Sequence, residues 1–281
     1  MSGLKSLSRS AMRALGIMLL SLPQSHRGEA AEAIGQHWPA NQQISMTQID
    51  HSTFDRLLKK HVDAEGMVNY AAWKASQTDR SALQNYLKHL SRANPRATAS
   101  KQAQLAFWIN AYNALTLEGI MQVYPTSSIR NHTAKVFGYN IWNDLPLVVG
   151  GKNHSLNQIE HDILRKMNEP RIHFAIVCAS IGCPKLRNEA YTMEKTDAQL
   201  TANAIDFFQH QKHFQIKPTQ NTIYLSSILD WFATDFGSTQ SEQLRYIAKF
   251  SPKSSRPLLT GQNVTVKYLD YNWGLNLKPS R

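Results

Sequence analysis

KQAQLAFWINAYNALTLEGIMQVYP, from Lys101 to Pro125, is the stretch around which this chain of 281 residues is built. Its length and the proline that ends it predict one long helix. Successive side chains on a helix turn by about 100°, so apolar side chains of this stretch point in every direction. Because a helix that is apolar all round is usually buried, the sequence predicts a central helix enclosed by the rest of the protein.

This predicted central helix also carries the polar residues Asn110, Tyr112 and Asn113. Buried amides must find hydrogen-bond partners. Two interpretations stay open. The amides satisfy backbone groups of a neighbouring loop, or these side chains bind substrate and an amide polarises a substrate carbonyl.

Shorter helices and strands flank the central helix on both sides. They alternate without a regular βαβ rhythm, which favours the α+β class. We predict one mixed domain in which the central helix packs on a small, largely antiparallel sheet. The predicted helices span 47–62, 79–90, 155–167, 197–209, 227–235 and 242–249, and the predicted strands span 67–70, 145–149, 172–178, 222–225 and 264–269, with a hairpin over 133–143.

The beginning of the chain has the pattern of an export signal. Basic residues precede the apolar run ALGIMLLSL (14–22), which is too short to span a bilayer, and Ala-Glu-Ala (31–33) fits a cleavage site. We predict a signal peptide over 1–33, a linker over 34–45 and a single domain over 46–281. The chain is therefore expected in the periplasm or outside the cell. A flexible N-terminus or an uncleaved anchor is the alternative.

The formal net charge of +11 indicates which classes of partner the protein could bind. A basic surface attracts anionic envelope polymers or lipids. The basic residues are scattered, however, and no Lys/Arg block has interleaved aromatic residues, so nucleic-acid binding is not predicted. A small-molecule or peptide-like ligand is the expected partner.

HFAIVCASIGCPKL (173–186) contains both cysteines of the chain, Cys178 and Cys183. Three interpretations of the pair stay open: a disulfide, a thiol nucleophile or redox pair, and two buried structural thiols. Their spacing departs from zinc-binding patterns, so no metal is predicted. The chain has no phosphate-binding glycine loop, no G-x-S-x-G and no H-E-x-x-H, and we predict no cofactor.

A nucleophilic thiol needs a base, and the nearby candidates are His161 and His173, with Glu160 as a neighbouring carboxylate. If 172–178 is a strand, His173 and Cys178 point to opposite faces. On the helix 155–167, His161 lies about 140° from the apolar stripe and can face a cleft formed by another segment. Glu160 lies only about 40° from that stripe, so it needs a partner or a raised pKa.

LDYNWGLN (269–276) adds a carboxylate after the last predicted strand. Asp270 can orient a histidine, as the third member of a thiol site does. The alternative is that Asp270 caps a turn while the aromatic residues after it anchor the chain.

Several motifs in the same order resemble domain-of-unknown-function family 547. They are FWINAYNAL (107–115), HDILR (161–165), HF with CAS and CP (173–184), DWF with DF (230–236) and DYNW with LN (270–276). The resemblance spans residues 46–277. It implies no particular activity, and it implies a distant kinship to papain-like or transglutaminase-like folds.

These observations lead to one leading hypothesis, a cysteine-centred hydrolase or acyl/amide transferase. Cys178 is its nucleophile, His161 before His173 its base, and Asp270 or Glu160 the orienting carboxylate. The substrate-binding set is Asn110, Tyr112, Asn113 and Ser180. The alternative is a non-catalytic envelope binding module in which Cys178–Cys183 is a structural disulfide.

Overall fold

The computed structural model describes residues 33–134 and 139–279, so the predicted signal peptide lies outside it except for its last residue. Helices and two small sheets intermix, which confirms the α+β class. The helices are α1 Ser52–His61, α2 Tyr70–Ala75, α3 Gln77–Leu90, α4 Lys101–Val123, α5 Ile141–Asp144, α6 Leu156–Gln158, α7 Thr196–Gln209, α8 Ile228–Trp231, α9 Ala233–Phe236, α10 Gln240–Ala248 and α11 Arg256–Leu259. The strands are β1 Leu147–Val149, β2 Lys152–His154, β3 Phe214–Lys217, β4 Thr222–Ser226 and β5 Thr265–Leu269.

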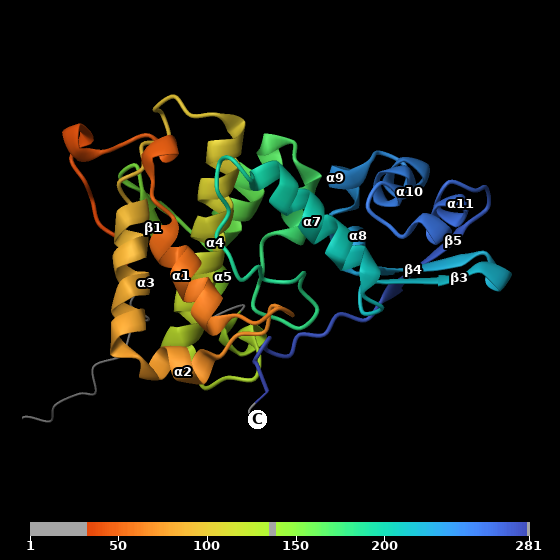
Figure 1. Ribbon diagram of the computed structural model, residues 1–281, viewed down its shortest axis with the longest axis horizontal. Coiled ribbons are helices and arrows are strands. Elements are labelled where there is room, and N and C mark those ends of the chain that lie inside the picture. Colours follow the sequence, from red (N-terminus) through yellow and green to blue (C-terminus); the bar gives the residue numbers. More distant parts are fainter. Residues whose placement is uncertain (1–32, 135–138, 280–281) are drawn as a thin grey trace, which may run out of the picture.

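Helix α4 is the buried centre that its sequence predicts. The Ser100 hydroxyl caps its first turn by accepting from the Ala103 N–H at 3.2 Å. Nearly every side chain from Ala103 to Met121 is buried. Helices α3 and α7 and the π-helical turn Ile159–Leu164 enclose α4, whereas the three-stranded sheet lies at the other end of the molecule (Figure 1). The structure thus differs from the predicted helix-on-sheet packing, because an all-round apolar surface needs cover on every side.

The strands form two separate sheets. Strands β1 and β2 make an antiparallel hairpin, β3 and β4 pair antiparallel, and β4 pairs parallel with β5. The β3–β4–β5 sheet carries α8 to α11 beside it in Figure 1.

The predicted strand 172–178 is wrong. Pro170–Phe174 is a 3-10 turn, and residues 175–178 after it form neither a strand nor a bridge. Side chains take the place of a neighbouring strand: Asn113 accepts from the Val177 N–H at 2.9 Å and donates to the Ala175 carbonyl at 3.0 Å. Because these backbone groups are already satisfied, no ladder is needed.

Two further predicted segments also differ from regular elements. The helix expected over 155–167 begins with α6, continues as the π-helical turn and ends as a 3-10 turn. Of the hairpin over 133–143, a single bridge joins Thr133 to Asn140, and 135–138 lies outside the described residues.

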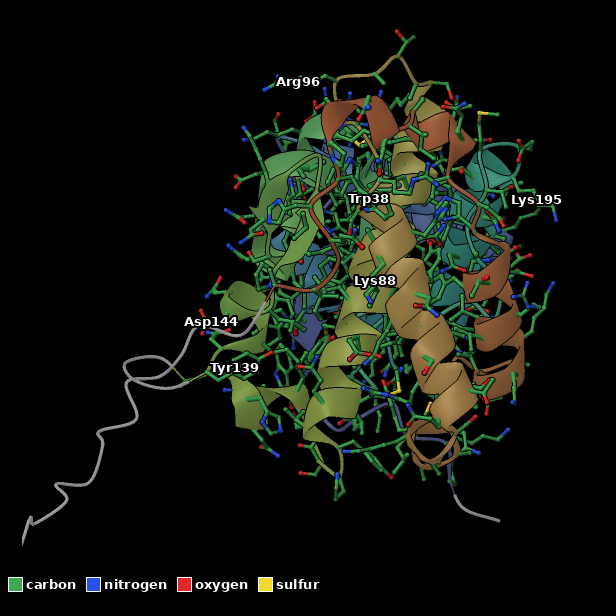
Figure 2. The ribbon with its side chains drawn as sticks, turned by 90° about the vertical axis from the view of Figure 1, so that its left-hand side faces the viewer. Trp38, Lys88, Arg96, Tyr139, Asp144 and Lys195 are labelled. Carbon is green, nitrogen blue, oxygen red and sulfur yellow. The ribbon has the colours of Figure 1, made fainter. Side chains whose placement is uncertain are left out.

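The predicted linker 34–45 packs along the helical part of the molecule. Ile34 bridges to Leu147, and Ile44 bridges to Ala93. Figure 2 shows Trp38 of this segment beside α3, where its indole N–H donates to the Lys88 carbonyl at 3.3 Å. Within 33–134 and 139–279, no helix combines the length and the apolar character that crossing a bilayer requires.

Two hydrophobic clusters make up the core. The larger surrounds α4, and the smaller joins the sheet to α7 and to α8–α10 around Phe174. Tyr271 packs against both clusters. After β5 the chain returns from the sheet to the helical part along the lower edge of Figure 1.

On this return path the segment 272–278 fastens the cysteine loop. The Gly182 N–H donates to Asn272 and the Ile181 N–H to Gly274, both at 2.8 Å. The Asn276 N–H donates to the Ala179 carbonyl at 3.0 Å. The loop between the two cysteines is therefore held by a segment from a distant part of the sequence.

Candidate functional site

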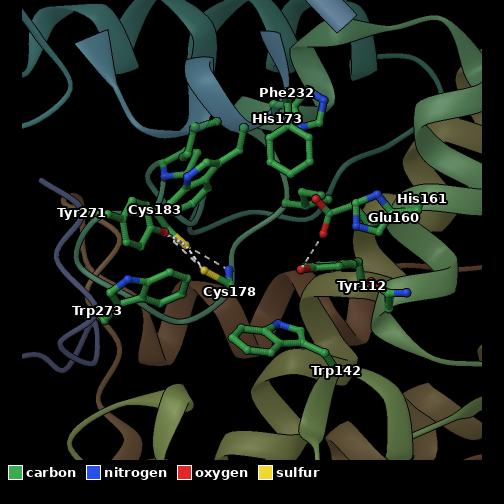
Figure 3. Close-up of a pocket in the computed structure, with 15 residues that line it drawn as sticks. Tyr112, Trp142, Glu160, His161, His173, Cys178, Cys183, Phe232, Tyr271 and Trp273 are labelled. Atoms are coloured by element: carbon green, nitrogen blue, oxygen red, sulfur yellow. Dashed lines mark hydrogen bonds between the residues drawn. The ribbon is translucent and has the colours of Figure 1, made fainter. Parts of the chain in front are cut away.

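A cavity of about 200 Å³ lies where the two hydrophobic clusters meet. Pockets at such junctions are preferred ligand sites. Figure 3 shows the cysteines on one side, Glu160 and Tyr112 opposite them, and His173 with Phe232 above. The lining residues are Tyr112, Trp142, Asn157, Glu160, His161, His173, Ile176, Cys178, Cys183, Pro184, Ile228, Trp231, Phe232, Tyr271 and Trp273.

The cysteine loop has a strained backbone beside the sulfur that lines this cavity. Ala179 has φ 59°, in the left-handed region that residues other than glycine rarely adopt. Such a conformation costs about 1 to 3 kcal/mol and often marks a functional site. The hydrogen bond from the Asn276 N–H to the Ala179 carbonyl helps to keep the loop in this shape.

Both cysteines are free thiols, and their sulfurs lie 2.7 Å apart. Cys178 is half-buried, whereas Cys183 is 3% exposed. Tyr271 Oη lies 3.3 Å from the Cys178 sulfur and 3.1 Å from the Cys183 sulfur, and Ser180 Oγ lies 3.1 Å and 3.3 Å from them. The Cys178 N–H also donates to the Cys183 sulfur at 3.0 Å.

This arrangement favours one negative charge on the pair. Burial by itself would raise the pKa of Cys183, but hydrogen bonds from Cys178, Ser180 and Tyr271 lower that pKa to about 6. The hydrogen bond to Cys183, followed by burial, raises the pKa of Cys178. The two thiols thus share one proton near neutral pH, with the charge on the sulfur that accepts more donors.

Glu160 faces the sulfurs from the other side of the cavity (Figure 3). Its carboxylate accepts from the Tyr112 hydroxyl at 3.2 Å. Burial raises the pKa of Glu160 to about 7, against the opposing effect of the Tyr112 hydrogen bond. The position close to the apolar stripe predicts a partner or a raised pKa, and the structure has both.

The two histidines line the cavity and belong to an ionic network with Arg165 and Asp235. His173 Nε2 lies 2.7 Å from Asp235, whose carboxylate also accepts two hydrogen bonds at 2.7 Å from Arg165. Burial lowers the pKa of His173 to about 4 and also lowers the pKa of His161. Arg165 can only donate, so its contact of 3.1 Å with His161 Nδ1 assigns the ring proton of neutral His161 to Nε2.

The cavity brings together Cys178, Glu160, His161, His173 and Tyr112 of the predicted site. Ser180 contacts both sulfurs from the loop itself. Within the described ranges, no hydrogen bond joins a cysteine sulfur to a histidine ring. Nor do three or more Cys, His, Asp or Glu side chains gather as a metal site in the part of the chain that the structure describes.

Asp270 lies outside the cavity. It is exposed and lines a separate hollow beside the cysteine loop. The carboxylate that bonds to a histidine of this cavity is Asp235, which is not among the predicted site residues. Its motif, DWF with DF (230–236), is the signal that could have directed attention to it.

The amides of α4 face the backbone rather than the cavity. Asn110 donates to the Tyr191 carbonyl at 2.8 Å and accepts from the Tyr191 N–H at 3.0 Å. Asn113 likewise donates to one backbone group, the Ala175 carbonyl, and accepts from another, the Val177 N–H. This geometry matches the interpretation in which the amides hold neighbouring loops, and Asn113 thereby positions the segment that leads to Cys178.

Asn110→Ala should lower the free energy of unfolding by about 2 to 3 kcal/mol, because it leaves two buried backbone groups of Tyr191 without partners. Urea unfolding of both proteins measures this difference. Asn157→Ala is the matched control, since Asn157 lines the cavity but is exposed, and its stability should stay within about 0.5 kcal/mol of the wild type. Unchanged stability of Asn110→Ala would contradict the structural role.

Fold and site together define an α+β protein with a paired-thiol pocket between two hydrophobic clusters. Residues 96–208 match the family described as "Protein of unknown function, DUF547", which confirms the resemblance to family 547 over this part of the chain. The matched segment contains both cysteines, Glu160 and both histidines, whereas Asp235 and Tyr271 follow it. Neither the curated proteins nor the solved structures include a match to this chain. Kinship with papain-like or transglutaminase-like folds stays a prediction.

Proposed function

We propose that this protein is a thiol-dependent hydrolase or acyl/amide transferase. The observation that carries the proposal is the pair of sulfurs 2.7 Å apart at one wall of a cavity whose opposite wall holds Glu160. An activated nucleophile needs a partner that takes its proton, and a leaving group needs one that supplies a proton. The sulfur pair meets the first need and Glu160 the second.

In the acylation step, the Cys178 sulfur attacks the substrate carbonyl and forms a thioester. Its proton passes to the Cys183 thiolate, which replaces a histidine as the base. The bond between the carbonyl and the leaving group breaks, and the leaving group takes the proton of neutral Glu160. This assignment follows from the contacts, because Cys183 touches the nucleophile and neither histidine does so among the described residues.

In the second step, water or an amine attacks the thioester. The Glu160 carboxylate takes the proton of the attacking group, and the Cys178 sulfur is released and recovers its proton from Cys183. Both residues return to their starting protonation states. A pKa of Glu160 of about 7 suits a group that gives and then takes a proton at neutral pH.

The proposal predicts that iodoacetamide alkylates the reduced wild-type protein with an apparent pKa near 6, whereas an ordinary cysteine titrates near about 8.5. The measurement is the alkylation rate between pH 5 and 9, followed by mass spectrometry. An alkylation rate that rises only above pH 8 would contradict the proposal that the thiol is activated. A Cys178–Cys183 bridge in the isolated protein, with no gain in activity or labelling on reduction, would favour the binding module instead.

We also propose that the chain is exported to the periplasm or secreted. The support is the basic start, the short apolar run and the Ala-Glu-Ala sequence (31–33). The intact mass of the protein recovered from the cell envelope tests this proposal together with the redox state of the cysteines. A mass that includes residues 1–33 would contradict cleavage at the proposed site.

A further inference from the structure

The cavity beside the cysteines has mainly aromatic walls. Trp142, Trp231 and Trp273 line it together with Tyr271 and Phe232. The Trp231 side chain is 49% exposed at this site, although it stacks on Trp273 with ring centroids 5.8 Å apart. An exposed tryptophan at the edge of an aromatic pocket is available to contact a ligand.

The charge of the lining is unlike that of the whole chain. The chain has 31 Lys and Arg residues against 20 Asp and Glu, but among the residues that the structure describes no Lys or Arg lines the cavity. Within 33–134 and 139–279, the only Asp or Glu in the lining is Glu160. Two arginines that do not line the cavity contact residues around it: Arg165 pairs with Asp235, and the Arg130 guanidinium lies 5.2 Å from the centre of the Trp273 ring.

We propose that this cavity binds the alkylammonium group of an amine. The π faces of tryptophan and tyrosine attract cations, and a carboxylate across the cavity adds a second attraction. An anionic group would meet the same π faces and the same carboxylate without a basic partner. A volume of about 200 Å³ accommodates a small amine or the end of a larger one.

This inference deepens the proposed function and depends on it for one consequence. If the thiol carries an acyl group, an amine in the cavity is the acceptor or the leaving group of an amide transfer. The ammonium group must lose one proton to solvent before its nitrogen can attack, and the Glu160 carboxylate on the opposite wall takes the second proton, which the nitrogen loses as the amide forms. Binding itself needs no reaction, so it can be tested separately.

The test is calorimetric titration of the full chain, under reducing conditions at pH 7.5, with three ligands of one shape. These are choline, the neutral 3,3-dimethylbutan-1-ol and the anion 3,3-dimethylbutanoate. Choline should bind at least about tenfold more tightly than the alcohol, and the anion should bind most weakly. Equal affinities for choline and the alcohol, or a preference for the anion, would overturn the proposal.

Variants locate the binding. Trp231→Ala should weaken choline binding about tenfold without loss of folding, because this side chain is half exposed. Glu160→Gln should weaken choline but not the alcohol. Trp38→Ala is the control of the same residue type on another face, and it should leave the affinity unchanged. Full choline affinity in Trp231→Ala would place the cation elsewhere.

Affinity for choline should rise from pH 6 to pH 8 as Glu160 loses its proton, and Glu160→Gln should remove most of this rise. Cys183 titrates near pH 6, so the comparison with Glu160→Gln isolates the carboxylate. The titratable and charged groups around Glu160 are Tyr112, His161, Arg165, His173, Cys178, Cys183 and Asp235. If choline binds as proposed but the alkylation rate is that of an ordinary thiol, the cation site is supported and the thiol-dependent reaction is contradicted.

Discussion

Cys183→Ala should slow the alkylation of Cys178 at pH 6.5 by about tenfold, although Cys183 itself is nearly inaccessible. The Cys183 sulfur holds the negative charge that the pair shares. Without it, no neighbouring sulfur takes the proton of Cys178, and only about one per cent of an isolated thiol is ionised at pH 6.5. The higher intrinsic reactivity of a more basic thiolate offsets part of that loss.

Cys178→Ala is the matched variant for this experiment. It should abolish rapid alkylation of the native protein, because the remaining sulfur is only 3% exposed. Labelling after unfolding in urea gives the total thiol content of each variant. If Cys183→Ala reacts as fast as the wild type at pH 6.5, the two sulfurs do not share a proton, and the base in the proposed reaction must be sought elsewhere.

Acidification from pH 7 to pH 4 should destabilise the native state by several kcal/mol, and buried histidines are a main cause. Burial lowers the pKa of His213 to about 2 and that of His173 to about 4. In the unfolded chain both titrate near about 6.5. A depressed pKa gives stability that is present above pH 6.5 and is lost as the pH falls toward the folded-state value, about 3 kcal/mol for each group at pH 4.

His213→Phe isolates one of these contributions. His213 is 1% exposed, stacks on Phe207 with centroids 4.0 Å apart, and its Nδ1 has no hydrogen-bond partner among the described residues. A phenylalanine keeps the stack and cannot take a proton. Urea unfolding at pH 7 and pH 4 should therefore show a difference smaller by about 3 kcal/mol in the variant. The same pH dependence in both proteins would contradict the assignment.

The centre of the fold could be predicted because one segment contains the whole signal. The stretch 101–125 is long, apolar on all sides and ended by a proline, and these features need no partner to be recognised. The environment of Glu160 follows similarly, because its angular position on a helix depends only on nearby residues. Local periodicity is therefore enough to predict the buried helix and the burial of Glu160 on one wall of the cavity.

The parts of the fold and of the site that the sequence did not predict depend on contacts between residues that are distant in the sequence. The stretch 172–178 has the composition of a strand, but the side chains of Asn113 and Asn203 satisfy its backbone from two helices. The contact between His173 and Asp235 spans two motifs that give no sign of facing each other. Aromatic residues such as Trp231 look like core residues until the fold places them around a cavity.

The fastening of the cysteine loop by residues 272–278 has a consequence for how the protein matures. During synthesis the two thiols leave the ribosome long before the segment that immobilises them. Until that segment docks, no hydrogen bond from it stabilises the strained turn at Ala179, and both sulfurs can form disulfides with thiols of other molecules. The reactive arrangement is thus assembled last, so an incomplete chain cannot acquire it.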